Sequence, residues 1–154
     1  MKIYLTTCRK PTQGTRKLAK FFERFFGWAY ENRGKRSLEE LVAKAEENGL
    51  SRLAFVYESH GNPSEIAFYE DGWLQPRVLI MSFELAGGKH GFGDGIVVNA
   101  ESDGKRLAEL FGIDGDEEGE EKAYLSGEGI ILEAGENVLR LKIKVVNENH
   151  GQAD

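Results

Sequence analysis

The 154-residue sequence is poor in the residues that build disulfides, metal sites and membrane spans. Its single cysteine, Cys8, cannot form an internal disulfide, so stability must come from packing and a cytoplasmic location is expected. Its three histidines, His60, His90 and His150, lack the spacing of zinc ligands. No apolar run reaches the roughly 18 residues of a membrane span, and the first residues lack a signal peptide's apolar stretch. We therefore expect no membrane, metal or cofactor.

Apolar residues are frequent enough to fill a core. They make up 40% of the chain and include nine Phe, five Tyr and two Trp, while 30% of the residues are charged. A chain of this length and composition is typical of one domain with a solvated surface. Only a short tail, 148–154, is expected to be flexible. No feature selects an oligomeric state, and a monomer is the default expectation.

Hydrophobic periodicity predicts a chain that mixes strands and helices. Ser37 and Glu40 form a capping box at the start of one helix, which closes before Gly49. The glycine-rich segment 87–95 is expected to be a flexible connector between two halves, about 1–86 and about 96–147. The prediction is one α/β (α+β) domain, 1–154, in which each half is a small mixed sheet with helices. Helices are expected at 15–26, 37–48 and 103–111, and strands at 2–8, 28–31, 52–58, 64–70, 77–85, 96–99, 123–125, 130–133 and 138–146.

Charge is distributed unevenly along the chain. The first 36 residues carry ten Lys/Arg against two Glu, whereas the remaining 118 carry ten against 24 Asp/Glu. The whole chain has a formal net charge of −6. A concentrated basic segment in an acidic chain indicates a polyanionic partner. An RNA phosphate backbone is the leading candidate.

The helix expected at 15–26 has two chemically opposite sides. With successive residues about 100° apart, four cations share one side and five apolar residues share the other. A solvated face without a ligand is the alternative. Like charges four residues apart repel by a few tenths of a kcal/mol, however, so RNA contact is favoured. The cations are Arg16, Lys17, Lys20 and Arg24, and the apolar residues are Leu18, Phe21, Phe22, Phe25 and Phe26.

Two short basic segments flank this helix. Arginine offers a planar fork to phosphate oxygens and lysine a point charge, while Gly34 allows a close backbone approach. Thr12 and Asn32 can add neutral hydrogen bonds, and the N–H groups at the helix start favour an anion. A merely basic turn is the alternative for residues 32–36. The predicted RNA-binding set is Arg9, Lys10, Thr12, Arg16, Lys17, Lys20, Arg24, Asn32, Arg33, Lys35 and Arg36.

Catalytic interpretations find little support in the sequence. The glycine-rich segment fails as a phosphate loop, because Lys89 is followed by His90 instead of Ser or Thr. Cys8 fits a small buried strand residue better than a nucleophile. The acidic run 114–121 is most simply a solvated loop, although it could repel RNA or dock a basic ribosomal protein. We expect a non-enzyme, and two alternatives stay open: a protein-interaction module that uses the acidic half, and an enzyme with a carboxylate site.

The basic segments also carry a family resemblance. Thr6–Thr12, followed by Thr15–Arg16 and Asn32–Lys35, resembles the N-terminal signature of the Brix domain of ribosome-biogenesis factors, in its archaeal single-domain form. The resemblance spans about residues 5 to 143. Departures are Cys8 where a Ser is usual, and segments 69–73 and 135–137, which lack the family's prolines. Further similar segments are Leu53–Glu58, His60–Pro63, Leu132–Gly135 and Val138–Leu141.

The resemblance implies a fold, a function and partners. It implies two halves of similar α/β fold, akin to the anticodon-binding domains of some tRNA synthetases. It also implies binding to ribosomal RNA or its precursor, and a chaperone-like role in rRNA processing or small-subunit assembly. Ribosomal or assembly proteins are further possible partners. None of these statements follows from composition or periodicity alone.

Overall fold

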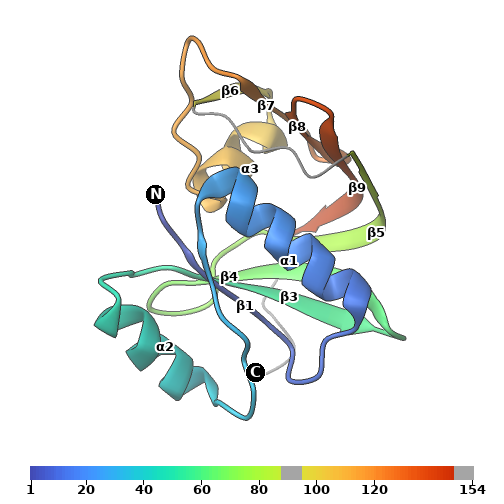
Figure 1. The fold of residues 1–154 in the computed structure, drawn as a ribbon. Coiled ribbons are helices and arrows are strands. Elements are labelled where there is room, and N and C mark those ends of the chain that lie inside the picture. The colour runs from blue at the N-terminus through green and yellow to red at the C-terminus, as the bar shows by residue number, and fades with distance from the viewer. Residues whose placement is uncertain (88–94, 148–154) are drawn as a thin grey trace. The chain divides into compact units, whose positions relative to one another are not determined.

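A computed structural model describes residues 1–87 and 95–147 and confirms the predicted α/β class (Figure 1). The chain divides into two compact units, an N-terminal unit of Lys2–Val78 with Val146 onward and a C-terminal unit of Leu79–Val145 with Met1. The elements in chain order are β1 (Tyr4–Thr7), α1 (Gln13–Phe26), β2 (Ala29–Tyr30), α2 (Leu38–Glu47), β3 (Leu53–Ser59), β4 (Asn62–Tyr69), β5 (Arg77–Ala86), β6 (Ile96–Ala100), α3 (Asp103–Leu110), β7 (Glu121–Leu125), β8 (Gly129–Ala134) and β9 (Asn137–Val146).

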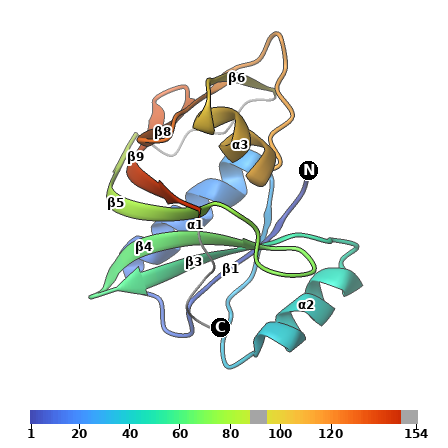
Figure 2. The same ribbon diagram turned by 180° about the vertical axis from the view of Figure 1, so that it is seen from behind.

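The N-terminal unit is a sheet in the order β2-β1-β3-β4, in which β1 runs parallel to β2 and β3. Helix α1 lies across one face of this sheet, in front of the strands in Figure 1 and behind them in Figure 2. Its apolar side is buried as predicted, and the ring centroids of Trp28 and Phe68 pack 6.2 Å apart beside it. The buried residues of α1 are Thr15, Leu18, Ala19, Phe21, Phe22 and Phe25.

Helix α2 packs on a second cluster of the same unit. Leu41 and Ala45 of the helix are buried with Tyr4, Leu53 and Phe55 from β1 and β3. These strand residues alternate with those that face α1, as side chains along a strand must. The predicted capping box is present, since Ser37 Oγ accepts a 3.2 Å hydrogen bond from the Glu40 backbone N–H. The sheet therefore has a helix packed on each of its faces.

The C-terminal unit repeats this plan with different residues. Its strands follow the order β5-β9-β8-β7-β6, with β6 parallel to β7 and β7, β8 and β9 antiparallel. Helix α3 connects the parallel pair and contacts both of its strands. Each unit thus holds a parallel pair, followed by an antiparallel strand; α1, β2 and α2 connect the pair β1/β3, whereas α3 is the one helix between β6 and β7. The division falls before Leu79, so most of β5 joins the C-terminal unit rather than the half ending near 86.

Several boundaries differ from the expected ones. Helix α1 begins at Gln13, and β4 begins at Asn62 because the turn is confined to His60 and Gly61, both with positive φ. The expectation of a solvated loop through residue 121 is wrong at its end, since Glu121 is buried in β7. The expected connector, apart from its end residues, and the expected tail lie outside the described residues, as do His90 and His150.

Candidate nucleic-acid interface

The sheet topology of the N-terminal unit gathers the predicted basic segments at one edge. Strands β1, β2 and β3 are parallel, so their carboxyl ends lie at the same edge of the sheet. Segment 8–12 leaves β1 there and segment 31–37 leaves β2 there. The Glu31 backbone N–H donates to the Leu5 carbonyl at 3.1 Å, which ties the two exits together. Residues 26 positions apart in sequence thus become neighbours.

Glu58 organises this edge at the end of β3. Its Oε1 accepts hydrogen bonds from the Thr12 backbone N–H at 2.5 Å and from the Thr15 hydroxyl at 2.7 Å. The Thr12 hydroxyl lies 2.7 Å from the same oxygen and 3.0 Å from the Gly61 carbonyl. The carboxylate therefore lies at the start of α1, where the helix dipole favours a negative charge, and it binds the N-cap N–H and two hydroxyl groups.

The same contacts set the ionisation of Glu58 and Cys8. Partial burial alone would raise the pKa of Glu58, but the hydrogen bonds from Thr12, Thr15 and Cys8 outweigh it and lower that pKa. Partial burial and the neighbouring Glu58 carboxylate raise the pKa of the Cys8 thiol. Cys8 therefore stays protonated and is a poor nucleophile at neutral pH.

The exposed side of α1 carries the predicted row of cations. Arg16, Lys17, Lys20 and Arg24 are all exposed, as the helical spacing predicts. Within residues 1–87 and 95–147, no carboxylate forms an ion pair with Arg16, Lys17 or Lys20. Glu23, the acid within the helix, instead accepts a 3.1 Å hydrogen bond from the Tyr30 backbone N–H. Most of the row therefore presents its charge to solvent.

The segment 32–36 forms a compact turn with a shallow hollow of about 440 Å³. Arg36 Nη1 donates to the Asn32 carbonyl at 3.0 Å, and Arg33 Nε donates to the Arg36 carbonyl at 3.1 Å. Gly34 has φ +60°, a conformation that other residues rarely adopt, so the turn itself requires glycine here. Asn32 and Lys35 are exposed and Arg36 is half-buried.

Arg33 does not share the exposure of its neighbours. It is only 2% exposed, and its guanidinium carbon lies 5.8 Å from the centroid of the Phe55 ring. Burial is the main cause that lowers the pKa of Arg33, and burial likewise raises the pKa of nearby Tyr57 to about 12. This guanidinium packs against the sheet as a cation–π partner. It anchors the turn, and we omit it from the surface that could meet a phosphate.

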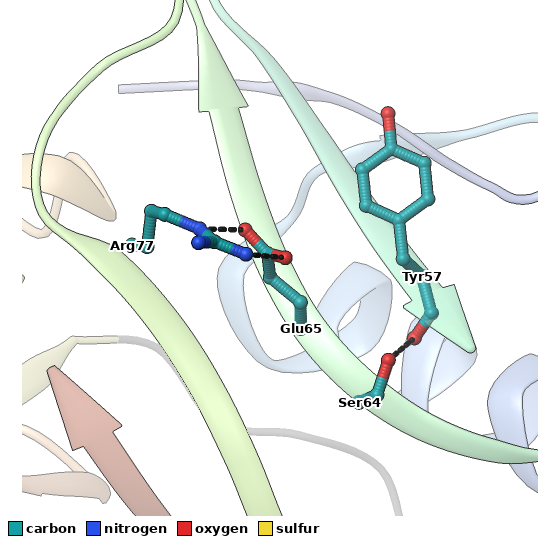
Figure 3. A network of polar contacts seen from close by, with 4 residues as sticks. All are labelled: Tyr57, Ser64, Glu65 and Arg77. Carbon is teal, nitrogen blue, oxygen red and sulfur yellow. Dashed lines mark hydrogen bonds and ion pairs between the residues drawn. The ribbon is translucent and has the colours of Figure 1, made fainter. Parts of the chain in front are cut away.

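An ion pair between Arg77 and Glu65 joins β4 and β5 of the same sheet. Figure 3 shows Arg77 paired with the buried carboxylate of Glu65, through contacts of 3.2 Å from Nε and 3.0 Å from Nη2. The Ser64 hydroxyl donates to the Tyr57 carbonyl at 3.4 Å in the same view. The two-pronged geometry is the strong form of an arginine–carboxylate pair. It links β4 to the first residue of β5.

The predicted site residues fall into three groups. Arg9, Lys10 and Thr12 are exposed on the segment between β1 and α1, beside Glu58. The α1 row and the exposed part of turn 32–36 supply the other two groups. The helical periodicity of the sequence predicted the row of cations on α1. No pattern in the neighbouring sequence predicted the role of Glu58, because its partners Thr12 and Thr15 lie 46 and 43 residues away. We call the predicted set without Arg33 the N-terminal basic surface.

Residues 1–87 and 95–147 contain neither a metal-binding cluster nor a membrane-spanning helix. No group of three or more His, Cys, Asp or Glu side chains in these ranges is arranged to hold a metal ion. No helix there is long and apolar enough to cross a membrane.

Sequence comparison identifies archaeal relatives, although no family model matches the chain. A probable Brix domain-containing ribosomal biogenesis protein of Archaeoglobus fulgidus is 45% identical over 82 residues, which cover 53% of this chain and 48% of that protein. A protein of the same description from Methanothermobacter thermautotrophicus is 43% identical over 67 residues, or 44% and 41% of the two chains. The matched part thus spans about half the length of these relatives.

Structure comparison extends the similarity over nearly the whole chain. The crystal structure of Mil, an archaeal Imp4-like protein, matches 95% of this chain and 99% of its own with a TM-score of 0.72 and 26% identity. A probable ribosomal biogenesis protein from Aeropyrum pernix has the same fold, with a TM-score of 0.72, 20% identity and coverage of 99% and 98%. The predicted relationship to the Brix-domain proteins is confirmed.

Proposed function

We propose, from this relationship to the Brix-domain proteins, that the chain is a non-catalytic, cytoplasmic ribosome-biogenesis factor that binds RNA phosphates. The N-terminal basic surface would make these contacts and assist the processing or assembly of ribosomal RNA. The observation that carries the proposal is the row of exposed cations on α1, of which Arg16, Lys17 and Lys20 have no carboxylate partner in the described chain.

Physical considerations support a phosphate ligand over a solvated face. Arg16 and Lys20 lie four residues apart on one helix side, where like charges destabilise the helix. The parallel strand ends bring Arg9, Lys10 and Lys35 to the same sheet edge, which concentrates positive charge further. Such a surface attracts a nucleic-acid backbone at long range and gains free energy by releasing its counterions.

Glu58 has a supporting role in this proposal. By holding the Thr12 and Thr15 contacts it fixes the start of α1 and the preceding segment, which carries Arg9 and Lys10. The carboxylate also takes the backbone N–H of Thr12, the N-cap residue of α1, so that this group is not open to a phosphate. Glu58 is thus a positioning residue and makes no RNA contact of its own.

The test is RNA binding across a salt series, with wild type beside Arg16→Glu/Lys20→Glu. Each phosphate contact contributes about −0.7 to −0.9 to the slope of log affinity against log salt. We expect a steep slope for wild type, and a slope shallower by about 1.4 to 1.8 for the double variant. The matched control is Lys105→Glu/Arg106→Glu, which makes the same charge change on exposed residues of α3. If both double variants changed the slope equally, the effect would come from the total charge of the protein and not from RNA contacts of the α1 cations.

The remaining alternatives give distinct results in the same samples. Incubating RNA with the protein and a divalent cation tests the non-catalytic part, which strand cleavage or turnover would overturn. The acidic segment offers a protein-docking alternative, because Asp114, Asp116, Glu117, Glu118 and Glu120 are all exposed. If neutralising these five residues abolishes partner capture while the α1 variant leaves it intact, the acidic surface is the functional one.

A further inference from the structure

The C-terminal sheet has one face that α3, the helix of its own unit, does not cover; we call it the uncovered face. On β7, β8 and β9 buried and more exposed residues alternate, except at Val145 and Val146 at the end of β9. Helix α3 contacts β6 and β7, and its own buried residues include Leu107 and Leu110. The opposite side is exposed or half-buried along all three strands. Cross-strand register places Tyr124 opposite Ile131 and Ile131 opposite Arg140, so these three form one row on the uncovered face.

This face concentrates the positive charge of an otherwise acidic unit. The described part of the C-terminal unit contains six Lys and Arg residues, and four of them project from this face. Glu133 is the acid on the same side of these three strands. A sheet face that is merely exposed to water does not require this separation of charge, because a mixture of acidic and basic side chains is hydrated equally well. The four cations are Lys122, Arg140, Lys142 and Lys144, all exposed.

A hollow of about 680 Å³ lies on this face. Phe83, Tyr124 and Ile131 supply its apolar lining, while Arg140 and Lys142 line it from β9. The volume suits a drug-sized or nucleotide-sized group, with aromatic rings available for stacking. Carboxylates at the hollow accept hydrogen bonds, and the amino groups of nucleobases can donate them. These carboxylates are Glu84, Glu101 and Glu128.

We propose that the uncovered face of the C-terminal sheet is a second RNA-binding site, which takes a single-stranded segment. A base would stack on Tyr124, beside Phe83 in the same hollow, and Arg140, Lys142 and Lys144 would contact the adjoining phosphates. The pairing of rings with a line of cations is the arrangement by which proteins hold single strands. An acidic peptide fits less well, because the three carboxylates of the hollow would repel its charges but not an uncharged base.

The experiment uses the full chain and a fluorescent single-stranded oligouridine of about eight nucleotides, within the range one small module covers. Binding stoichiometry is measured by titration at low salt. Wild type is expected to bind two oligonucleotides, and Arg140→Glu/Lys142→Glu is expected to bind one. The control Lys105→Glu/Arg106→Glu, with equal charge change on α3, should keep both sites. Thermal unfolding of each variant verifies that it folds.

Stacking is tested separately from charge. Tyr124→Leu keeps an apolar side chain but removes the ring, and should weaken binding at this site at least about fivefold. Tyr124→Phe keeps the ring and should bind within about twofold of wild type. A loss caused by charge reversal without any loss in Tyr124→Leu would overturn the stacking part, and with it the preference for RNA.

The remaining outcomes separate this inference from the proposed function. A single wild-type site that Arg16→Glu/Lys20→Glu removes would overturn the second site and leave the N-terminal surface standing. A single site that only Arg140→Glu/Lys142→Glu removes would support the second site and overturn the N-terminal one. Binding of a polyglutamate peptide to this face, in place of the oligonucleotide, would make it a protein-docking surface and overturn the inference.

Discussion

The two units share a strand plan but differ in the helix that each places on its sheet. Helix α1 has 14 residues, and its exposed side is a row of four cations. Helix α3 has eight residues and mixes Asp103 and Glu109 with Lys105 and Arg106. The shared topology decides which helix face meets solvent. The choice of residues on that face decides whether it attracts a polyanion or is merely hydrated.

The helices also pack by different means. Helix α1 buries large side chains, among them Phe21, Phe22 and Phe25. Helix α3 has Gly104 against β7, where an added Cβ would overlap the Leu125 carbonyl group. Close backbone approach replaces bulky side chains in the shorter helix. The C-terminal unit should therefore be the more sensitive one to small additions of volume.

The largest effect is expected from Gly104→Ala. The new methyl group cannot fit without moving α3 away from β7, so the free energy of unfolding should fall by about 3 kcal/mol. Urea denaturation measures the loss. The matched control is Gly135→Ala, where no atom lies within 4 Å of the new Cβ and only the left-handed backbone, φ +61°, is unfavourable. That control should cost about 1 kcal/mol, and equal losses would contradict the close packing of α3.

An intermediate effect is expected from Glu58, which binds Thr12 and Thr15 at the start of α1. At the start of α3, by contrast, the side chain of the N-cap residue Ser102 makes no cap hydrogen bond. Glu58→Ala removes the acceptor for Thr12 and Thr15 and should lower the free energy of unfolding by about 1 kcal/mol. Glu58→Gln keeps an acceptor oxygen and should lose less.

The pH dependence gives a second measure of the same contact. Hydrogen bonds hold the folded-state pKa of Glu58 below the ordinary carboxyl value of about 4.5, so its stabilisation is fully present above that pH. It is lost as the pH falls through the folded pKa. The difference in stability between wild type and Glu58→Gln should therefore shrink in acid, and a constant difference from pH 7 to pH 3 would exclude an ionic role.

The smallest effect has opposite signs in the two helices. Lys20→Glu converts two repulsive contacts, with Arg16 and Arg24, into attractive ones and should stabilise the fold by a few tenths of a kcal/mol. Lys105→Glu places a like charge four residues before Glu109 and should destabilise by a similar amount. Thermal unfolding at low salt resolves the signs. Destabilisation by Lys20→Glu would show that the row serves stability and would remove the argument for a ligand.

Local patterns predicted the helical features well because they depend on neighbours in sequence. The two sides of α1, the Ser37 capping box and the strand–helix alternation are confirmed. The prediction that the solvated loop extends through Glu121 was wrong. Glu121 is buried in β7, where it pairs with Ala134, a residue 13 positions further along the chain. The role of the individual cations stays a prediction, which the binding experiments address.

The charge asymmetry, the amphipathic α1 and the resemblance to the Brix-domain proteins could be predicted from the amino-acid sequence, since each depends on short segments of the chain. The folded chain was needed to show that Arg33 is buried against Phe55, that Glu58 binds Thr12 and Thr15, and that four C-terminal cations share one sheet face. The physical reason is that burial and strand register depend on partners tens of residues away. No local periodicity encodes those partners, and folding alone brings them together.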